Sequence, residues 1–88
     1  MTDGQAIKKL EEENCKNVYV WNASPNEDDP THSHPYDTAL IVLEGELLVK
    51  MNGQVLKLEV EDRADIPKGV VHSARAGAEG CKYVVGKK

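Results

Sequence analysis

Apolar and polar residues alternate in short stretches along most of the chain, a pattern that predicts β-strands. The alternating stretches cover residues 18–23, 47–51, 54–60, 64–66, 70–75 and 82–85. The run 38–43 differs, because it is apolar on both of its faces. Such a strand must be covered on both faces. We therefore expect one face to line a barrel interior and the other to meet a helix or another subunit.

Turn residues separate these stretches and limit the fold to a few options. Asn52 and Gly53 predict a two-residue hairpin, since both positions tolerate positive φ. Gly45 marks a tight turn or a bulge. Residues 66–69 fit a type I turn, and residues 76–80 are predicted to form a glycine-rich turn. About seven or eight short strands result, which predicts an all-β fold, a small antiparallel β-barrel or sandwich.

The first residues have a different pattern. Apolar positions in residues 3–14 recur at helical spacing, and charged residues fill the opposite face. Thr2 and Gln5 fit a capping box at the start of this helix. We therefore expect a short N-terminal helical segment, residues 1–16, packed on a single barrel domain, residues 17–88.

Composition narrows the classes of partner. The chain of 88 residues is sufficient for one domain, and its net charge of -4, without a basic stripe, argues against a nucleic-acid partner. No apolar run reaches the ~18 residues of a membrane span, and the first residues do not resemble a secretory signal. Cys15 and Cys81 fit no Cys-x-x-Cys spacing and are expected as reduced thiols. We expect a cytoplasmic protein with no membrane partner.

The candidate chemistry lies in the three histidines, His32, His34 and His72. Because side chains alternate along an extended chain, His32 and His34 point the same way. A third imidazole from a later strand, His72, would complete a three-cornered metal site. The alternative is a pair of solvated histidines in a polar loop, since histidine is only intermediate in burial.

Two segments resemble the motifs of a known family. Residues 30–38, Pro-Thr-His-Ser-His-Pro-Tyr-Asp-Thr, followed by Gly45, resemble the first motif of the cupin superfamily. Residues 67–72, Pro-Lys-Gly-Val-Val-His, resemble the core of its second motif. Two positions depart from that pattern: Glu61 stands where the second motif opens with glycine, and Ala76 stands where the family has asparagine.

The resemblance implies a β-barrel of the cupin or jelly-roll type with one divalent metal ion held by His32, His34 and His72. The usual fourth ligand of the family is a glutamate at the position of Thr38, and threonine is a poor metal ligand. Asp37 could replace it, although strand alternation points Asp37 to the other face. Imidazole does not choose sharply among Zn, Fe, Ni, Mn and Cu, so the metal stays open.

Strand parity predicts the walls of a ligand pocket. With Thr38 facing the site, every second residue of its strand faces inward, and so do the matching residues across the hairpin. Two aromatic residues are expected at the opening, although core packing is the alternative for each pocket residue. The predicted pocket residues are Tyr36, Thr38, Leu40, Val42, Val49, Met51 and Trp21.

The function that follows is a metal-dependent enzyme acting on a small oxygen-rich molecule, such as a sugar derivative or an organic acid. Isomerase, lyase and dioxygenase activities all fit, and the motifs do not separate them. Asp37 and Tyr36 are the candidates for a catalytic base. The alternative is a non-catalytic module that binds or senses a small ligand, which the lack of an evident general base favours. The small size and the two-faced strand also predict a homodimer.

Overall fold

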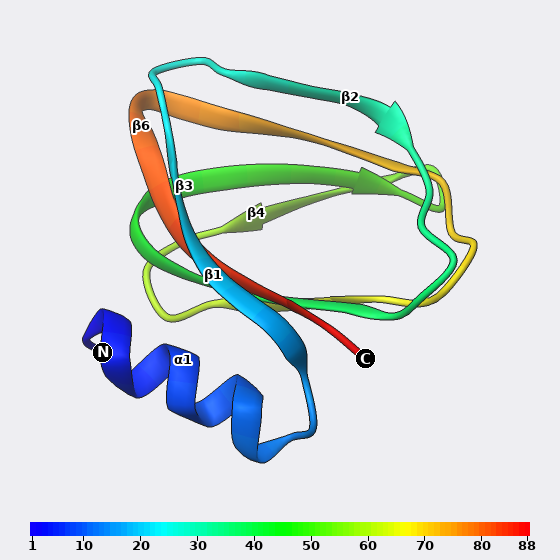
Figure 1. Ribbon diagram of the computed structural model, residues 1–88. Helices are drawn as coiled ribbons and strands as arrows, with labels where there is room; N and C mark the ends of the chain where they lie inside the picture. Colours follow the sequence, from blue (N-terminus) through cyan, green and yellow to red (C-terminus); the bar gives the residue numbers. More distant parts are fainter.

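The computed structural model describes residues 1–88 as one helix followed by six strands (Figure 1). The elements are α1 (Asp3–Glu12), β1 (Lys16–Ala23), β2 (Asp28–His32), β3 (Thr38–Met51), β4 (Gln54–Leu58), β5 (Arg63–Ile66) and β6 (His72–Lys87). Every strand pair is antiparallel. The predicted all-β antiparallel architecture with a short N-terminal helix is confirmed.

The two long strands, β3 and β6, form the centre of the barrel. They pair with each other along nearly their whole length, from Thr38 opposite Lys87 to Met51 opposite His72. Each also pairs with two shorter strands, β5 and β4 along β3, and β1 and β2 along β6. Because the short strands bind different halves of the long ones, the sheet curls around an interior (Figure 1).

Both long strands bend where Gly45 lies opposite Cys81, and the register shifts on either side of this point. Gly45 has a φ of 74°, and a Cβ there would lie 2.2 Å from the backbone oxygen of Gly80. Only glycine allows such a close approach of two backbones. The predicted turn or bulge at Gly45 is therefore a bulge inside β3.

The structure has fewer strands than expected, because two predicted breaks are bends within longer strands. The glycine-rich turn expected at residues 76–80 is wrong, since β6 runs without interruption from His72 to Lys87. Gly80 has a φ of 83°, which lets the strand bend while its pairing with β3 resumes beyond the bend. A glycine in the sequence indicates the bend but not whether the neighbouring strand continues to pair.

The turns that flank the site are partly as predicted. The hairpin is confirmed, with φ values of 53° at Asn52 and 73° at Gly53. The turn after β5 lies one residue later than expected, because the N–H of Val70 donates to the carbonyl of Pro67 at 3.2 Å. Gly69, at the third position of this turn, has a φ of 80°. A type II turn requires that conformation, so the expected type I turn is wrong.

Glu61 occupies a backbone position that suits glycine. Its φ is 71°, in the left-handed region, and its N–H donates to the carbonyl of Val42 at 2.8 Å. Glutamate at this position therefore adopts a left-handed conformation that glycine would adopt without strain.

Apolar side chains form two clusters on opposite faces of β3. The interior cluster is Leu40, Val42, Leu47, Val49, Leu58, Ala64, Ile66, Ala76 and Cys81. The outer cluster is Ala6, Leu10, Cys15, Ala39, Ile41, Leu43 and Val84. Helix α1 thus covers the outer face of β3 (Figure 1). Of the two expected alternatives, a helix or another subunit, the structure shows the helix. The homodimer stays a prediction. No helical segment combines the length and apolar character that crossing a membrane requires.

Candidate metal centre

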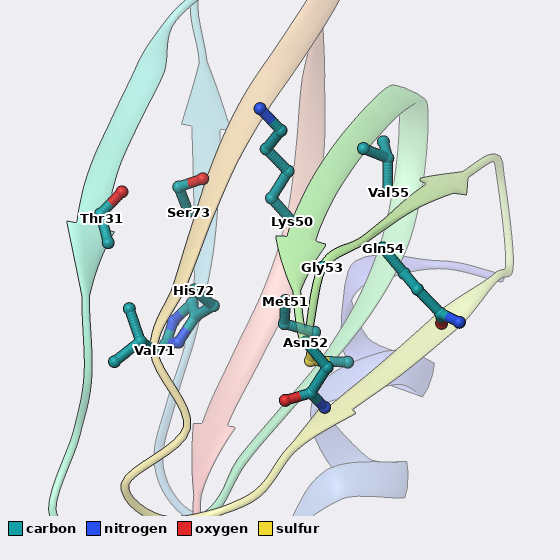
Figure 2. Close-up of a pocket in the computed structure, with 10 residues that line it drawn as sticks. All are labelled: Thr31, Lys50, Met51, Asn52, Gly53, Gln54, Val55, Val71, His72 and Ser73. Atoms are coloured by element: carbon teal, nitrogen blue, oxygen red, sulfur yellow. The ribbon is translucent and has the colours of Figure 1, made fainter.

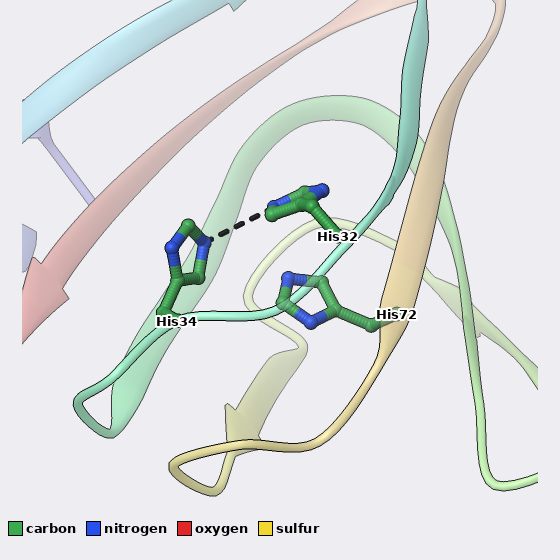
Figure 3. Close-up of side chains that lie close together, drawn as sticks. All are labelled: His32, His34 and His72. Carbon is green, nitrogen blue, oxygen red and sulfur yellow. Dashed lines mark hydrogen bonds between the residues drawn. The ribbon is translucent and has the colours of Figure 1, made fainter.

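The fold brings the three histidines together at one end of the barrel (Figure 3). His32 ends β2 and His72 begins β6, and these two residues pair directly across the two strands. His34 follows in the next loop, where its carbonyl accepts a hydrogen bond of 2.9 Å from the N–H of Gly69. One ring nitrogen of each histidine lies within 4.8 Å of the others. The three-cornered arrangement expected from the sequence is present.

Hydrogen bonds to the backbone fix the proton positions on two of the rings. The Nδ1 of His32 bonds to the carbonyl of Pro30, and the Nδ1 of His72 bonds to the carbonyl of Val70 at 3.0 Å. A carbonyl oxygen only accepts, so Nδ1 carries the proton in each neutral ring and Nε2 keeps its lone pair. Metal-ligating histidines typically have this arrangement, because the second-shell carbonyl orients the ring.

The third ring is held by a different partner. The Nε2 of His34 lies 3.0 Å from the Nε2 of His32, and its Nδ1 lies 3.2 Å from the hydroxyl of Tyr36. The rings of His34 and Tyr36 also stack, with centroids 4.9 Å apart. Burial and the neighbouring rings of His32 and His72 lower the pKa of His34. A lowered pKa favours neutral imidazole, which is the form that binds metals.

The donor set fits a divalent transition metal. Bonds of about 2.0–2.1 Å from one ion to two imidazole nitrogens, at ordinary ligand angles, place those nitrogens about 3 Å apart. The Nε2 atoms of His32 and His34 lie at that separation. His72 is buried and presents a free lone pair on the same side (Figure 3). Three neutral imidazoles leave the charge of such an ion uncompensated.

A cavity of about 360 Å³ adjoins the three histidines. Of the residues predicted to form the pocket, Thr38, Leu40 and Val49 line it. The other lining residues are Tyr19, Asp29, His32, His34, Leu47, Ile66, His72, Ala74, Tyr83 and Val85. Burial raises the pKa of Tyr83, so its phenol is neutral at pH 7. Tyr83 and Val85 are two positions apart on β6 and therefore face the same side. The sequence does not show how β6 pairs with β3, so it could not show that this side faces the cavity.

The remaining predicted residues lie outside this cavity. Val42 is fully buried in the interior cluster, and Tyr36 stacks on His34. The indole N–H of Trp21 donates to Glu27, and the residue is 45% exposed. Met51 lines a neighbouring cavity of about 280 Å³ beside the β3–β4 hairpin, which contains His72 but neither of the other histidines (Figure 2).

Asp37 also points away from the histidines, in agreement with the strand alternation. Its carboxylate accepts a hydrogen bond of 2.7 Å from the backbone N–H of Lys68, and it does not belong to the metal-binding cluster. Asp37 therefore joins the loop before β3 to the turn before β6. These two loops carry His34 and lead into His72, so the carboxylate supports the position of the site from outside.

The family model for the cupin domain matches residues 19–85. The chain is a cupin. Among solved structures, this cupin resembles a cupin superfamily protein from Desulfitobacterium hafniense, with a TM-score of 0.74 and 21% identity over 80% of this chain and 63% of the other. An uncharacterised protein with a double-stranded β-helix domain from Klebsiella pneumoniae has a TM-score of 0.70 and 33% identity over 80% and 64%. A cupin-2 domain protein from Shewanella frigidimarina has a TM-score of 0.69 and 29% identity over 77% and 65%.

The cupin therefore spans less than two thirds of the length of these structural relatives. Among curated proteins none matches the sequence. The comparisons support the fold and the family. Three histidines of this cupin are positioned to hold a metal ion, and the chemistry carried out there has to be argued from the site.

Proposed function

We propose that this cupin is a metal-dependent enzyme that acts on a small oxygen-rich molecule, such as a sugar derivative or an organic acid. The observation that carries the proposal is the pair of backbone hydrogen bonds at Nδ1 of His32 and of His72. They leave two Nε2 lone pairs directed toward His34 in the cluster of three rings. Without a metal, Nε2 of His32 accepts a hydrogen bond from Nε2 of His34, and the lone pair on Nε2 of His72 is left for an ion.

The histidines and the apolar lining residues have different roles in this proposal. His32, His34 and His72 would hold one divalent ion, Zn, Fe, Ni, Mn or Cu, which would supply Lewis-acid or oxygen-activating chemistry. Leu40, Leu47, Val49 and Val85 form apolar walls that exclude water from the bound substrate. A three-histidine site provides no ligand charge, so an anionic, oxygen-bearing substrate is favoured.

The first prediction concerns metal content, measured by mass spectrometry on protein freed of any histidine tag. We expect about one ion per chain in the parent and almost none in His32→Ala/His72→Ala, because two of three ligands are gone. Asp37→Asn is the matched control and should keep its metal, since Asp37 bonds to the N–H of Lys68. A parent that stays empty after each metal is added contradicts the proposal, and metal loss in Asp37→Asn would show that binding depends on the Asp37 carboxylate.

A non-catalytic binding module is the second candidate, and one observation favours it. Asp37 is held by Lys68 outside the cavity, and Tyr83 has a raised pKa, so neither offers a ready general base. Asp29 is the only carboxylate that lines the cavity. Turnover of sugars and organic acids by the metal-loaded protein separates the two functions. A ligand that raises the melting temperature and is never consumed supports the binding module.

A further inference from the structure

Asp29 is a carboxylate that the fold directs toward the cavity beside the histidines. It lies opposite Ala74 in the pairing of β2 with β6, and Ala74 packs against the interior cluster. Directly paired residues of antiparallel strands share a face of the sheet, so Asp29 is on the interior side. Its Oδ1 lies 3.7 Å from Nδ1 of His32, and both residues line the cavity. The side chain is 55% exposed, so the carboxylate is open to molecules that enter the cavity.

The negative charge of Asp29 has no cationic partner within the protein. Its charged contact is with His32, whose Nδ1 already donates its proton to the carbonyl of Pro30. A neutral imidazole, the form that binds metals, does not offset the charge of Asp29. The preceding residue differs, because Asp28 lies opposite Arg75 and pairs with it at 3.4 Å. Of two adjacent carboxylates, one is therefore balanced by an arginine and the other is available to a cation in the cavity.

Two phenol groups, those of Tyr19 and Tyr83, line the cavity with Asp29. Tyr19 on β1 lies opposite Val85, two positions from Tyr83 on β6, so the two tyrosines are diagonal neighbours on the interior side. Burial, and then the charges of Asp29 and Tyr19, raise the pKa of Tyr83, which places the three groups near one another. The phenol oxygen of Tyr83 is not buried without a hydrogen-bond partner, since Thr38 alone has such an atom. Tyr19 is 51% exposed, so both phenols are within reach of a ligand.

The carboxylate and the two phenols match an ammonium group. An ammonium has three N–H donors and one positive charge, and these three side chains provide oxygens that accept and one negative charge. The faces of aromatic rings also attract cations. A neutral hydroxyl could bond to the same oxygens, but it would leave the charge of Asp29 unbalanced. The charge therefore favours an amine over the hydroxyl of a sugar.

The histidines determine what the other end of the ligand has to be. Nε2 of His32 faces His34, whereas Asp29 lies on the Nδ1 side of the same ring. A metal ion at Nε2 and the carboxylate of Asp29 would therefore lie about one imidazole ring apart. An ion on three neutral histidines attracts an anionic group, and Asp29 attracts a cationic one. A small molecule with a carboxylate at one end and an amine at the other satisfies both.

We propose that this cavity binds small amino acids, and that Asp29 is the residue that selects their ammonium group. Tyr19 and Tyr83 accept the remaining N–H bonds, and the carbon chain packs against Leu47 and Val49. The volume of about 360 Å³ is near the lower end of ligand sites and limits the ligand to a small molecule. This inference rests on the proposed metal centre, which would bind the carboxylate.

The test uses three carboxylates of equal size that differ only at the far end, namely 4-aminobutanoate, 4-hydroxybutanoate and pentanoate. Each is titrated calorimetrically into zinc-incubated protein. We expect the amine to bind about tenfold more tightly than the methyl compound, with the hydroxyl compound between them, because hydrogen bonds between charged groups are the strongest. The same comparison with 3-aminopropanoate and its two counterparts shows which chain length fits.

Two variants assign the preference to one carboxylate. Asp29→Asn keeps the size of the side chain and removes its charge, so it should weaken 4-aminobutanoate binding about tenfold and leave pentanoate within about threefold of the parent. Asp28→Asn is the matched control and should bind all three compounds as the parent does, since Asp28 pairs with Arg75 on the other face. Tyr19→Phe removes one accepting oxygen and should weaken amine binding about threefold.

Three results would overturn the inference. The first is equal affinity of the parent for the amine and the methyl compound. The second is an amine preference that persists in Asp29→Asn, because the amine would then bind the metal or another group. The third is a hydroxyl compound that binds as tightly as the amine and loses as much in Asp29→Asn, because the site would then select hydroxyl groups.

Zinc content of the same samples separates this inference from the proposed function. Asp29→Asn should keep its zinc, because Nδ1 of His32 bonds to the carbonyl of Pro30. Loss of zinc in this variant would make Asp29 a positioning residue for His32 and would overturn the inference. Full zinc loading without an Asp29-dependent amine preference supports the metal centre and contradicts the role of Asp29. In protein that takes up no metal, an amine preference that depends on Asp29 contradicts the metal centre and supports the role of Asp29.

Discussion

Tyr36 contacts His34 through its hydroxyl group and its ring at the same time. In the observed hydrogen-bond pattern, Nε2 of His32 accepts, so Nε2 of His34 donates and Nδ1 of His34 accepts from the hydroxyl of Tyr36. Metal binding at Nε2 of His34 requires the proton on Nδ1 instead, where the same hydroxyl can accept it. Tyr36 is therefore a positioning residue that serves both tautomers of His34.

Removing this hydroxyl should weaken metal binding without disturbing the stack. Tyr36→Phe keeps the ring against His34 and beneath Lys87, and it loses only the hydrogen bond. Because second-shell partners typically contribute about 10- to 100-fold to metal affinity, we expect a loss in that range. Competition with a chelator of known affinity measures it. Tyr19→Phe, which removes a hydroxyl from the cavity beside the histidines, should bind metal as the parent does, and equal affinity of both variants would show that Tyr36 acts by stacking alone.

At the residue scale, strand alternation and the resemblance were enough to predict that the three histidines cluster. They also placed Thr38 and Leu40 on the interior face of β3. They could not find Ile66 or Tyr83 in the same cavity, since those depend on the pairing of β5 and β6 with β3. The sequence also could not predict that the hydroxyl of Thr38 is buried without a hydrogen-bond partner. The sequence shows the donor, and only the packed structure shows that nothing accepts from it.

At the scale of the elements, the bulge in β3 determines how the long strands bend around the interior. Gly45→Ala should destabilise the protein strongly, since the new Cβ would meet the carbonyl of Gly80 at 2.2 Å and φ is 74°. Gly53→Ala is the matched control, with a φ of 73° and no atom within 4 Å of the new Cβ. We expect a loss of about 1–2 kcal/mol for Gly53→Ala and at least twice that for Gly45→Ala.

Urea denaturation of the two variants measures the difference. Equal losses would mean that the left-handed backbone alone accounts for the cost and that the strands can separate at the bulge. A larger loss in Gly45→Ala assigns the difference to the contact between the two backbones, since the conformational strain is shared by both variants.

The elements that follow local rules were predictable from the sequence. The capping box of Thr2 and Gln5 is present in α1, and the hairpin at Asn52 and Gly53 has the positive φ values that its residues indicated. The errors occurred at glycines: Gly69 makes the turn type II, and Gly80 bends a strand that was expected to end. At Gly80 the choice depends on pairing with the distant strand β3, where Gly45 lies opposite Cys81.

At the scale of the whole molecule, an ion pair joins the end of α1 to the barrel. Arg63 on β5 donates two hydrogen bonds, of 2.7 and 2.6 Å, to the carboxylate of Glu13. These hydrogen bonds, with further attraction from Lys9 and Lys88, lower the pKa of Glu13 from 4.5 to about 2. The side chains are 29% and 26% exposed, so solvent weakens the pair, and we assign it about 1 kcal/mol.

The direction of the pKa shift gives the pH dependence. Because folding lowers this pKa, the contribution of Glu13 to stability is complete above pH 4.5 and is lost as the pH falls toward 2. Glu13→Gln should therefore lower the free energy of unfolding by about 1 kcal/mol at pH 7, and the difference from the parent should vanish near pH 2. Urea denaturation across this pH range measures both values. Glu11→Gln removes the same charge from the same helix without breaking an ion pair, and a parallel loss there would contradict the specific role of Glu13.

The long β6 strand also determines when the chain can fold. Strands β1 and β2 both pair with β6, which follows the other five strands along the chain. Lys16 lies opposite Lys87, and β1 pairs with no strand other than β6. Sheets built from such distant pairings fold slowly. The β1 ladder consequently forms only when β6 is in place, and we expect closure of the barrel to be a late step in folding.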